Sequence, residues 1–103
     1  MSVTYVIRFQ VEPSQRERFL ALLNGVLDAM RHEASFRSAA LHADPADPCA
    51  FLLYETWADH EEVVEVQLKR PYRAAWHAAL EAVLARPREI SVWQVLRADG
   101  ALG

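Results

Sequence analysis

Two stretches of the chain alternate apolar and polar side chains with a period of two, which is typical of β-strands. They cover Val3 to Val11 and Ile90 to Leu96. Phe51 to Trp57 is largely apolar on both faces, which predicts a central strand buried on both sides. A weaker strand pattern covers Phe36 to Ala43, and the turn residues Asp44 to Pro48 join it to the central strand as a β-hairpin.

The register of this hairpin decides which side chains share a face of the sheet. We expect its loop to centre near Asp47. One face then carries a histidine, a carboxylate and a tryptophan. The residues of that face are Ser38, Ala40, His42, Leu53, Glu55 and Trp57. A carboxylate on a buried strand is costly unless something pairs with it, so Glu55 requires a structural or functional reason.

The segment from Ser14 to about Ala34 has the spacing of an amphipathic helix. Pro13 ends the preceding strand, and Ser14 with Glu17 forms a capping-box pattern at the helix start. Gly25 lies inside the segment and costs about 1 kcal/mol of helix stability relative to alanine. The apolar stripe consists of Phe19, Leu23, Val26, Leu27 and Met30.

The region after Trp57 predicts two helices separated by Pro71. Asp59 with Glu62 forms a capping box at the start of the shorter helix. Proline is favoured in the first turn of a helix and disfavoured inside one, so the longer helix should run from Pro71 to about Ala85. The apolar positions are Val63, Val64, Val66 and Leu68 in the short helix and Tyr72, Ala75, Trp76, Ala79, Leu80 and Val83 in the long one.

The order of these elements, β-α-β-β-α-β with an extra short helix, is the ferredoxin-like pattern. This is an α+β fold with a four-stranded antiparallel sheet and its helices on one face. The opposite face would present apolar side chains to water, namely Val6, Leu41, Leu52, Tyr54, Trp93 and Val95. A patch of that size normally marks an interface, so we expect a homodimer packed sheet to sheet.

The 103 residues, 52% of them apolar, fit a single domain at residues 1–98 with a loose tail at 99–103. A net charge of −3 gives no electrostatic basis for binding nucleic acid or an anionic membrane. Cys49 is the only cysteine, which excludes an internal disulfide and a thiolate metal cluster. The chain has no apolar signal segment and no run of membrane-spanning length, so we expect a cytoplasmic protein.

Three short motifs follow one another along the chain. They are the hairpin motif His42 to Pro45, the strand end Tyr54-Glu55-Thr56-Trp57-Ala58-Asp59, and the helix start Arg70-Pro71-Tyr72. In this order and spacing the chain resembles the antibiotic biosynthesis monooxygenase (ABM) family over nearly its whole length. The resemblance implies a dimeric α+β barrel with a pocket between sheet and helices in each subunit. Members of that family include cofactor-free oxygenases of quinols and polycyclic phenols, as well as haem-degrading enzymes.

The resemblance also implies site residues. Trp57 matches the pocket tryptophan of the polyketide-oxidising members, and His42 matches a pocket histidine on their second strand. His77 falls where those members have an arginine and where haem-degrading members have their iron-ligating histidine. The chain differs from these branches at three further pocket positions, Ile7, Leu53 and Gln67.

The residues and the resemblance together predict a cofactor-independent monooxygenase that oxidises a quinol or polycyclic phenol with O₂. An electron-rich aromatic anion can reduce O₂ itself, so the protein needs an apolar pocket, a base and a means of stabilising the anion. His77 or His42 would be the base, because imidazole titrates near neutral pH. The expected catalytic residues are His77, His42 and Trp57, and the expected substrate-binding residues are Glu55, Gln67, Tyr72, Trp76, Leu53 and Ile7.

Several polar residues also have structural interpretations. Glu55 is interpreted first as a structural carboxylate that accepts backbone or cross-dimer hydrogen bonds, and second as a catalytic group. His32 and His60 lie at a helix end and a helix start, where we expect solvated surface residues.

Two other functions stay open: a non-catalytic dimer that binds a small ligand or a protein partner, and a haem-binding protein that uses His77 as its iron ligand. We expect no resident metal, because no histidine pair has ligand spacing on one element and His42, Glu55 and His77 would have to converge from three elements. We expect no cofactor, since none of the three glycines lies in a Gly-x-Gly pattern. The predicted partners are a small aromatic substrate, O₂ and a second copy of the chain.

Overall fold

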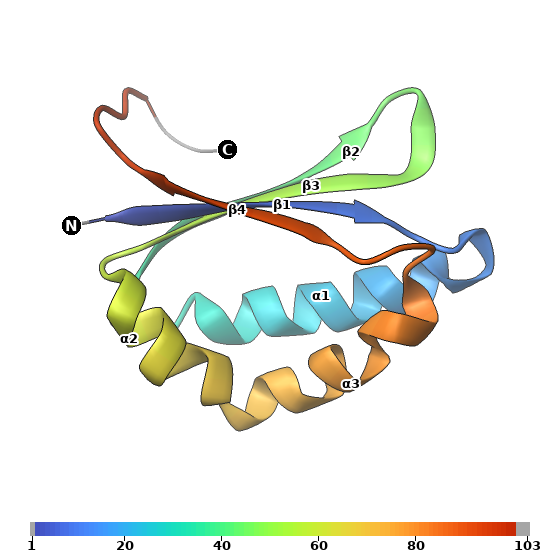
Figure 1. The fold of residues 1–103 in the computed structure, drawn as a ribbon, viewed down its shortest axis with the longest axis horizontal. Helices are drawn as coiled ribbons and strands as arrows, with labels where there is room; N and C mark the ends of the chain where they lie inside the picture. Colours follow the sequence, from blue (N-terminus) through green and yellow to red (C-terminus); the bar gives the residue numbers. More distant parts are fainter. Residues whose placement is uncertain (1, 101–103) are drawn as a thin grey trace.

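A four-stranded antiparallel sheet carries the helices on one of its faces (Figure 1). The computed structural model describes residues 2–100. The strands are β1 (Val3–Gln10), β2 (Phe36–Asp44), β3 (Asp47–Trp57) and β4 (Glu89–Gln94), in the spatial order β2-β3-β1-β4. The helices are α1 (Arg16–Met30), α2 (His60–Glu65) and α3 (Ala74–Val83), with 3₁₀ turns at Pro13–Gln15, Gln67–Lys69 and Pro71–Arg73. The predicted ferredoxin-like α+β fold is confirmed.

The two central strands supply the floor of the core, as their apolar patterns predict. β1 pairs with β3 on one side and with β4 on the other. Tyr5 lies opposite Glu55, and Ile7 lies opposite Leu53, so these four side chains share the face covered by helices. The buried residues of this face are Val3, Tyr5, Ile7 and Phe9 on β1 and Cys49, Phe51, Leu53, Glu55 and Trp57 on β3.

Helix α1 seals the core with the predicted stripe. Phe19, Leu23, Val26 and Met30 are buried, while Leu27 is half-buried. The ring centroid of Phe19 lies 5.1 Å from that of Phe9, 5.1 Å from that of Phe51 and 5.7 Å from that of Trp76. This aromatic cluster packs α1 and α3 against β1 and β3. It contributes strongly to the core, because large rings bury more apolar area than other side chains.

The predicted start and end of the first helix are wrong. No side chain caps α1, because the helical region already begins with the 3₁₀ turn at Pro13, which places Ser14 inside that turn. The helix ends at Met30 rather than near Ala34. The Asp59 cap of α2 is confirmed, since its carboxylate accepts a 3.0 Å hydrogen bond from the Glu62 N–H.

The second helical region buries fewer apolar side chains than predicted. In and after the six-residue helix α2, Val63 is buried but Val64, Val66 and Leu68 are exposed. On the longer segment Ala75 is exposed, and Arg73 is buried in its place. The 3₁₀ turn at Pro71–Arg73 precedes α3, so the α-helical part is shorter than the predicted range.

The faces predicted for the β2 side chains are wrong, although the pairs from Ala43 with Phe51 to Leu41 with Leu53 are centred on Asp47 as expected. Asp44 pairs with Asp47, so the turn lies at residues 45–46. The next pair is Ala43 with Phe51, which means that β3 advances four residues while β2 advances one. An odd offset of this kind exchanges the faces of a strand. The side chains of β2 therefore lie on the opposite faces from those predicted.

His42 and Leu41 show the consequence of this irregularity. His42 pairs with Leu52, and its ring lies 5.4 Å from that of Tyr54 on the face without helices. Leu41 pairs with Leu53 and packs against the core, although the sequence predicts it on the helix-free face. His42 therefore does not share a face with Glu55 and Trp57.

The helix-free face is apolar at most of the other predicted positions. Tyr54 and Trp93 are exposed, while Val6, Leu52 and Val95 are half-buried. The edge strand β4 is exposed on both faces, since Ile90 and Val92 on the helix side are also about half exposed.

The last predicted strand is shorter than expected and ends at Gln94 rather than Leu96. Leu96 is 91% exposed. Of the tail predicted at 99–103, residues 101–103 lie outside the described residues. Within residues 2–100, no helix is both long enough and apolar enough to span a membrane.

Gly25→Ala should stabilise the protein by about 0.5 to 1 kcal/mol, because alanine loses less conformational entropy in a helix than glycine. Gly25 lies on the exposed side of α1, and a Cβ atom built there has no heavy atom within 4 Å. Denaturant unfolding measures the change. Gly100→Ala is the control, since Gly100 has a φ of 76° that disfavours a side chain, and no gain is expected there. A loss of stability in Gly25→Ala would show that this part of α1 contacts something outside the subunit.

Candidate active site

A cavity of about 200 Å³ lies between the helix-covered face of the sheet and the helices. The strands form its floor and the three helices its walls, with mostly apolar side chains. Its main lining residues are Tyr5, Ile7, Leu53, Glu55 and Ile90 from the strands, Leu23 and Val26 from α1, His60 and Val63 from α2, and Arg73, Trp76, His77 and Arg88 from the region of α3. The cavity thus combines an apolar interior with a small group of ionisable side chains.

Glu55 brings a buried carboxylate to the floor of this cavity. It is 7% exposed, and burial raises its pKa above the ordinary value. Arg73, the indole N–H of Trp57 and Arg88 oppose that rise. Trp57 Nε1 donates to Glu55 Oε1 at 3.3 Å. Trp57 is fully buried and does not line the cavity. Its role there is to hold the Glu55 carboxylate through this hydrogen bond.

Arg73 brings a buried cation to the wall. Its side chain is 5% exposed, and its guanidinium carbon lies 5.8 Å from the Trp57 ring centroid and 5.6 Å from that of Tyr72. These cation–π contacts hold the planar group in place. One terminal nitrogen, Nη2, lies 3.9 Å from the sulfur of Met30. Within residues 2–100, the Nε atom has no hydrogen-bond partner.

His77 follows Arg73 by one helical turn, so both side chains reach the same wall of the cavity. Burial lowers the pKa of His77 from its ordinary value of 6.5, and the charges of Arg88 and Arg73 lower it further. The imidazole is consequently neutral at pH 7 and can accept a proton. This is the protonation state that a general base requires.

Tyr5 and His60 form a second polar pair at the cavity. The Tyr5 hydroxyl and His60 Nδ1 are joined by a hydrogen bond of 2.6 Å. Burial raises the pKa of Tyr5, and the carboxylates of Glu55 and Asp59 raise it further, so its hydroxyl keeps its proton. His60 is exposed, as its position at a helix start predicts, and it also contributes to the cavity wall.

The structure brings together five of the nine predicted site residues. They are Ile7, Leu53, Glu55, Trp76 and His77, which all line the cavity. Trp57, Gln67 and Tyr72 lie beside it and do not line it. His42 lies on the other side of the sheet because of the hairpin irregularity.

Gln67 does not line the cavity, and both N–H donors of its amide are used inside the protein. Its Nε2 donates to Glu33 Oε2 at 3.0 Å and to Glu62 Oε1 at 2.9 Å. Its Oε1 accepts a hydrogen bond of 3.4 Å from the Tyr72 hydroxyl. Gln67 therefore links the turn after α1, helix α2 and the 3₁₀ turn before α3.

Gln67→Leu should destabilise the fold by about 1 to 3 kcal/mol, since it removes the donor shared by two partly buried carboxylates. Gln67 is 1% exposed, so water cannot readily replace its amide. Thermal and denaturant unfolding measure the loss. Gln15→Leu, at the start of α1 where no side-chain cap forms, is the matched control and should change stability little. Equal stability of Gln67→Leu and wild type would contradict a structural role for this amide.

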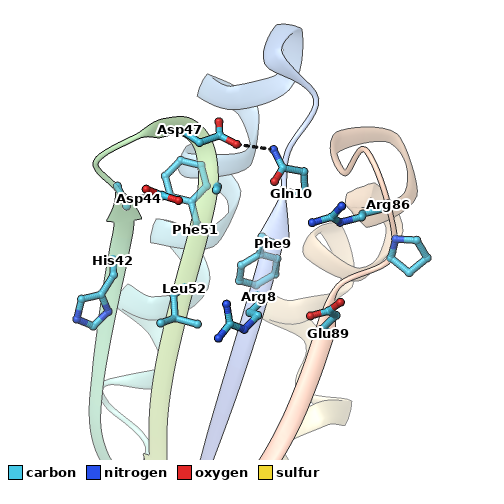
Figure 2. A pocket seen from close by; sticks show the side chains of 13 residues that line it. Arg8, Phe9, Gln10, His42, Asp44, Asp47, Phe51, Leu52, Arg86 and Glu89 are labelled. Atoms are coloured by element: carbon cyan, nitrogen blue, oxygen red, sulfur yellow. Dashed lines mark hydrogen bonds between the residues drawn. The ribbon is translucent and has the colours of Figure 1, made fainter.

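The hollow around His42 is larger but chemically different. It measures about 470 Å³ and lies near the hairpin end of the sheet. Figure 2 shows Arg8, His42, Leu52 and Glu89 there, with Asp47 accepting a hydrogen bond from the Gln10 side chain. Its charged groups are Arg8, Asp44, Asp47, Arg86 and Glu89, which are mixed in sign and, apart from Asp47, exposed. The smaller cavity under the helices is the better candidate for chemistry.

Comparison with known proteins assigns the family. The model of the antibiotic biosynthesis monooxygenase family matches residues 2–79. The chain belongs to this family. A candidate monooxygenase of Pestalotiopsis microspora, GME11364, is 31% identical over 93 residues, which are 89% of this chain and 78% of that relative.

Solved structures show the same ABM fold at lower identity. Rv0793 from Mycobacterium tuberculosis has a TM-score of 0.85 and 22% identity, covering 97% of this chain and 100% of that one. SnoaB, a cofactor-independent oxygenase from Streptomyces nogalater, has a TM-score of 0.80 and 18% identity, covering 94% of this chain and 95% of that one.

Four polar residues that line the cavity of this ABM chain are not among the site residues predicted from the sequence: Tyr5, His60, Arg73 and Arg88. Tyr5 belongs to the first alternating strand, and its pairing with Glu55 exists only in the folded sheet. The spacing of Arg73 and His77, one helical turn apart, was the available signal for Arg73. Arg88 lies in the loop before β4, and nothing in its local pattern indicates that its side chain turns into the cavity.

The possible metal triad of His42, Glu55 and His77 does not converge in this ABM chain. Glu55 and His77 face the cavity, and His42 faces the other way. Among residues 2–100, no three His, Cys, Asp or Glu side chains lie close enough to hold a metal ion.

Proposed function

We propose that the protein is a cofactor-independent monooxygenase that oxidises a quinol or a small polycyclic phenol with O₂. The observation that carries this proposal is His77, an imidazole of lowered pKa at the wall of an apolar cavity. A neutral imidazole beside a bound phenol is the group suited to remove its proton. The phenolate that forms is more easily oxidised than the phenol.

The reaction balances without an added reductant. A quinol and O₂ give a hydroxyquinone and water, so one oxygen atom enters the ring and the other leaves as water. All the electrons come from the substrate, and His77 accepts the phenolic proton. Trp76, Leu53 and Ile7 exclude water around the aromatic ring, which suits the binding of an apolar substrate.

The cavity size narrows the substrate. At about 200 Å³ it is below the range of about 300 to 1,000 Å³ that is typical of drug-sized ligands. It favours an aromatic of one or two rings over larger polycyclic substrates and over a tetrapyrrole such as haem. The space beside His77 also favours catalysis or ligand binding over a purely structural dimer.

Membership of the ABM family supports an oxygenase, and the fold shared with SnoaB supports the absence of a cofactor requirement. His77 is the proposed base. His42 is left out of the proposal, because it lies across the sheet from the cavity.

We further propose that the working form is a homodimer joined through the helix-free faces of the sheets. Tyr54 and Trp93 present large apolar surfaces there, and Trp93 is 61% exposed. Fully burying a large apolar side chain stabilises a protein by about 1.5 to 3 kcal/mol. Two such faces related by a two-fold axis bury these side chains against one another.

Oxygen consumption tests the function directly. Purified protein is incubated under air with one- and two-ring hydroquinones, including a menadiol, without added flavin, haem or metal and with a chelator present. We expect consumption of O₂ above the rate of autoxidation, with one O₂ used for each hydroxyquinone formed. Rates equal to autoxidation across the panel would contradict the proposal. Ligand binding without turnover would then favour the non-catalytic alternative.

A further inference from the structure

The cation of Arg73 lacks a full set of partners inside the protein. Its side chain lines the cavity and is 5% exposed, yet within residues 2–100 its Nε atom has no hydrogen-bond partner. No carboxylate among these residues lies within 4.0 Å of its guanidinium. An unpaired donor on a buried charge costs stability, and a ligand that accepts a hydrogen bond there would offset that cost.

A second cation faces the same space. Arg88 is half-buried and lines the cavity from the loop before β4. Burial lowers its pKa, Glu55 raises it, and Arg73 lowers it, which shows that the three charges interact. Two guanidinium groups thus share one carboxylate. With His77 neutral, the charged groups identified in the cavity lining are two guanidinium groups and one carboxylate.

We propose that Arg73 and Arg88 form an anion subsite that binds an oxyanion of the aromatic substrate. The inference rests on the proposed function only in taking this cavity as the substrate site. The oxyanion has two possible sources, a carboxylate carried by the ring and a ring hydroxyl that ionises in the site. Both offer the oxygen acceptors that guanidinium groups bind through charge-assisted hydrogen bonds.

Occupation of the subsite should also change the pKa of His77. The positive charges of Arg88 and Arg73 help to lower its pKa, so a bound anion that neutralises them should raise it. The base would become stronger when an anionic substrate is bound. This effect is independent of turnover and can be followed by NMR titration of the His77 ring under nitrogen.

Binding under nitrogen tests the subsite apart from oxidation. The probes are 2-naphthoate, 2-naphthol and the neutral 2-methoxynaphthalene, followed by tryptophan fluorescence because Trp76 lines the cavity. Loss of the charge-assisted hydrogen bonds should weaken an anionic probe about ten- to a hundredfold in Arg88→Gln. Arg18→Gln, on the exposed side of α1, removes the same charge elsewhere and is the matched control.

The probes separate the two sources of the oxyanion. Tight, arginine-dependent binding of 2-naphthoate identifies a carboxylate. Binding of 2-naphthol with the absorption spectrum of its anion identifies an ionised hydroxyl. Arg73→Gln tests the buried cation in the same way. If that variant does not fold, Arg73→Lys keeps the charge and removes the planar hydrogen-bonding geometry. Arg88→Gln then tests the subsite independently, because Arg88 is only half-buried and its replacement disturbs the core less.

The subsite is overturned if neither anion binds more tightly than 2-methoxynaphthalene. It is also overturned if Arg88→Gln weakens the neutral probe as much as the anions, or if the His77 pKa stays constant when an anion binds. Failure of the proposed function would look different, since arginine-dependent binding would persist without any oxidation of hydroquinones.

Discussion

His77→Gln is expected to lower kcat/KM for hydroquinone oxidation by about 10²- to 10⁴-fold, the range typical for loss of a general base. Glutamine preserves much of the size and polarity of histidine but cannot accept the phenolic proton. Ligand binding in the cavity should change little. Steady-state oxygen consumption and fluorescence binding together measure the two effects.

The role of His77 as a base also predicts the direction in which kcat/KM changes with pH. The protonated imidazole is inactive as a base, so kcat/KM should fall as the pH drops through the His77 pKa. Because the fold lowers this pKa, the acid limb should lie below pH 6.5. Arg88→Gln removes a nearby cation that lowers the pKa, so it should move the limb to higher pH.

Two other histidines serve as controls. His32→Gln changes an exposed residue after α1, and His42→Gln changes a residue on the opposite face of the sheet. Neither should reduce kcat/KM by the factor seen at His77. A large loss in His42→Gln together with full activity in His77→Gln would reverse the assignment of the base.

Trp93→Asp is expected to produce a destabilised monomer or insoluble protein. Trp93 lies on the helix-free face opposite Thr4, where the proposed dimer packs sheet against sheet. Burying an unpaired carboxylate costs on the order of several kcal/mol for each ion, and the two-fold axis applies this cost twice. Analytical ultracentrifugation at micromolar concentration measures the change in association.

Val92→Asp is the matched control on the same strand. Val92 is 54% exposed, similar to Trp93, but its side chain lies on the other face of β4. It should leave the sheet-to-sheet dimer intact. A stable wild-type monomer would contradict the dimer, and dissociation by Val92→Asp alone would mean that the wrong face has been assigned to the interface.

The strands and the main helical core were predictable from local periodicity. Side chains alternate along a strand and repeat every three to four residues along a helix, so Ile7 and Leu53 on the sheet and Phe19 and Leu23 on α1 are assigned inward without a structure. Pro71 likewise marks the division of the last helical region, because proline disfavours a helix interior. His77 was the best site candidate for a chemical reason, since imidazole titrates near neutral pH, and it lies at the cavity.

Other positions depend on contacts that local patterns do not contain. The turn beginning at Pro13 displaced the predicted cap at Ser14, and packing left Ala75 outside and Arg73 inside. Gln67 looks available from its sequence, but Glu33 in the turn after α1 and Glu62 in α2 both accept hydrogen bonds from its amide.

By itself, the sequence of this protein determined the α+β fold, the buried faces of the central strands and the presence of His77 near Trp76. The tertiary structure alone decided that His42 faces away, because one odd offset in the hairpin exchanges the faces of a whole strand. It also decided that Arg88 joins Arg73, Glu55 and His77, although these residues come from a loop, a helical segment and a strand. The pKa values of such groups depend on burial and on charges distant in sequence, so the chemistry of the cavity exists only in the folded chain.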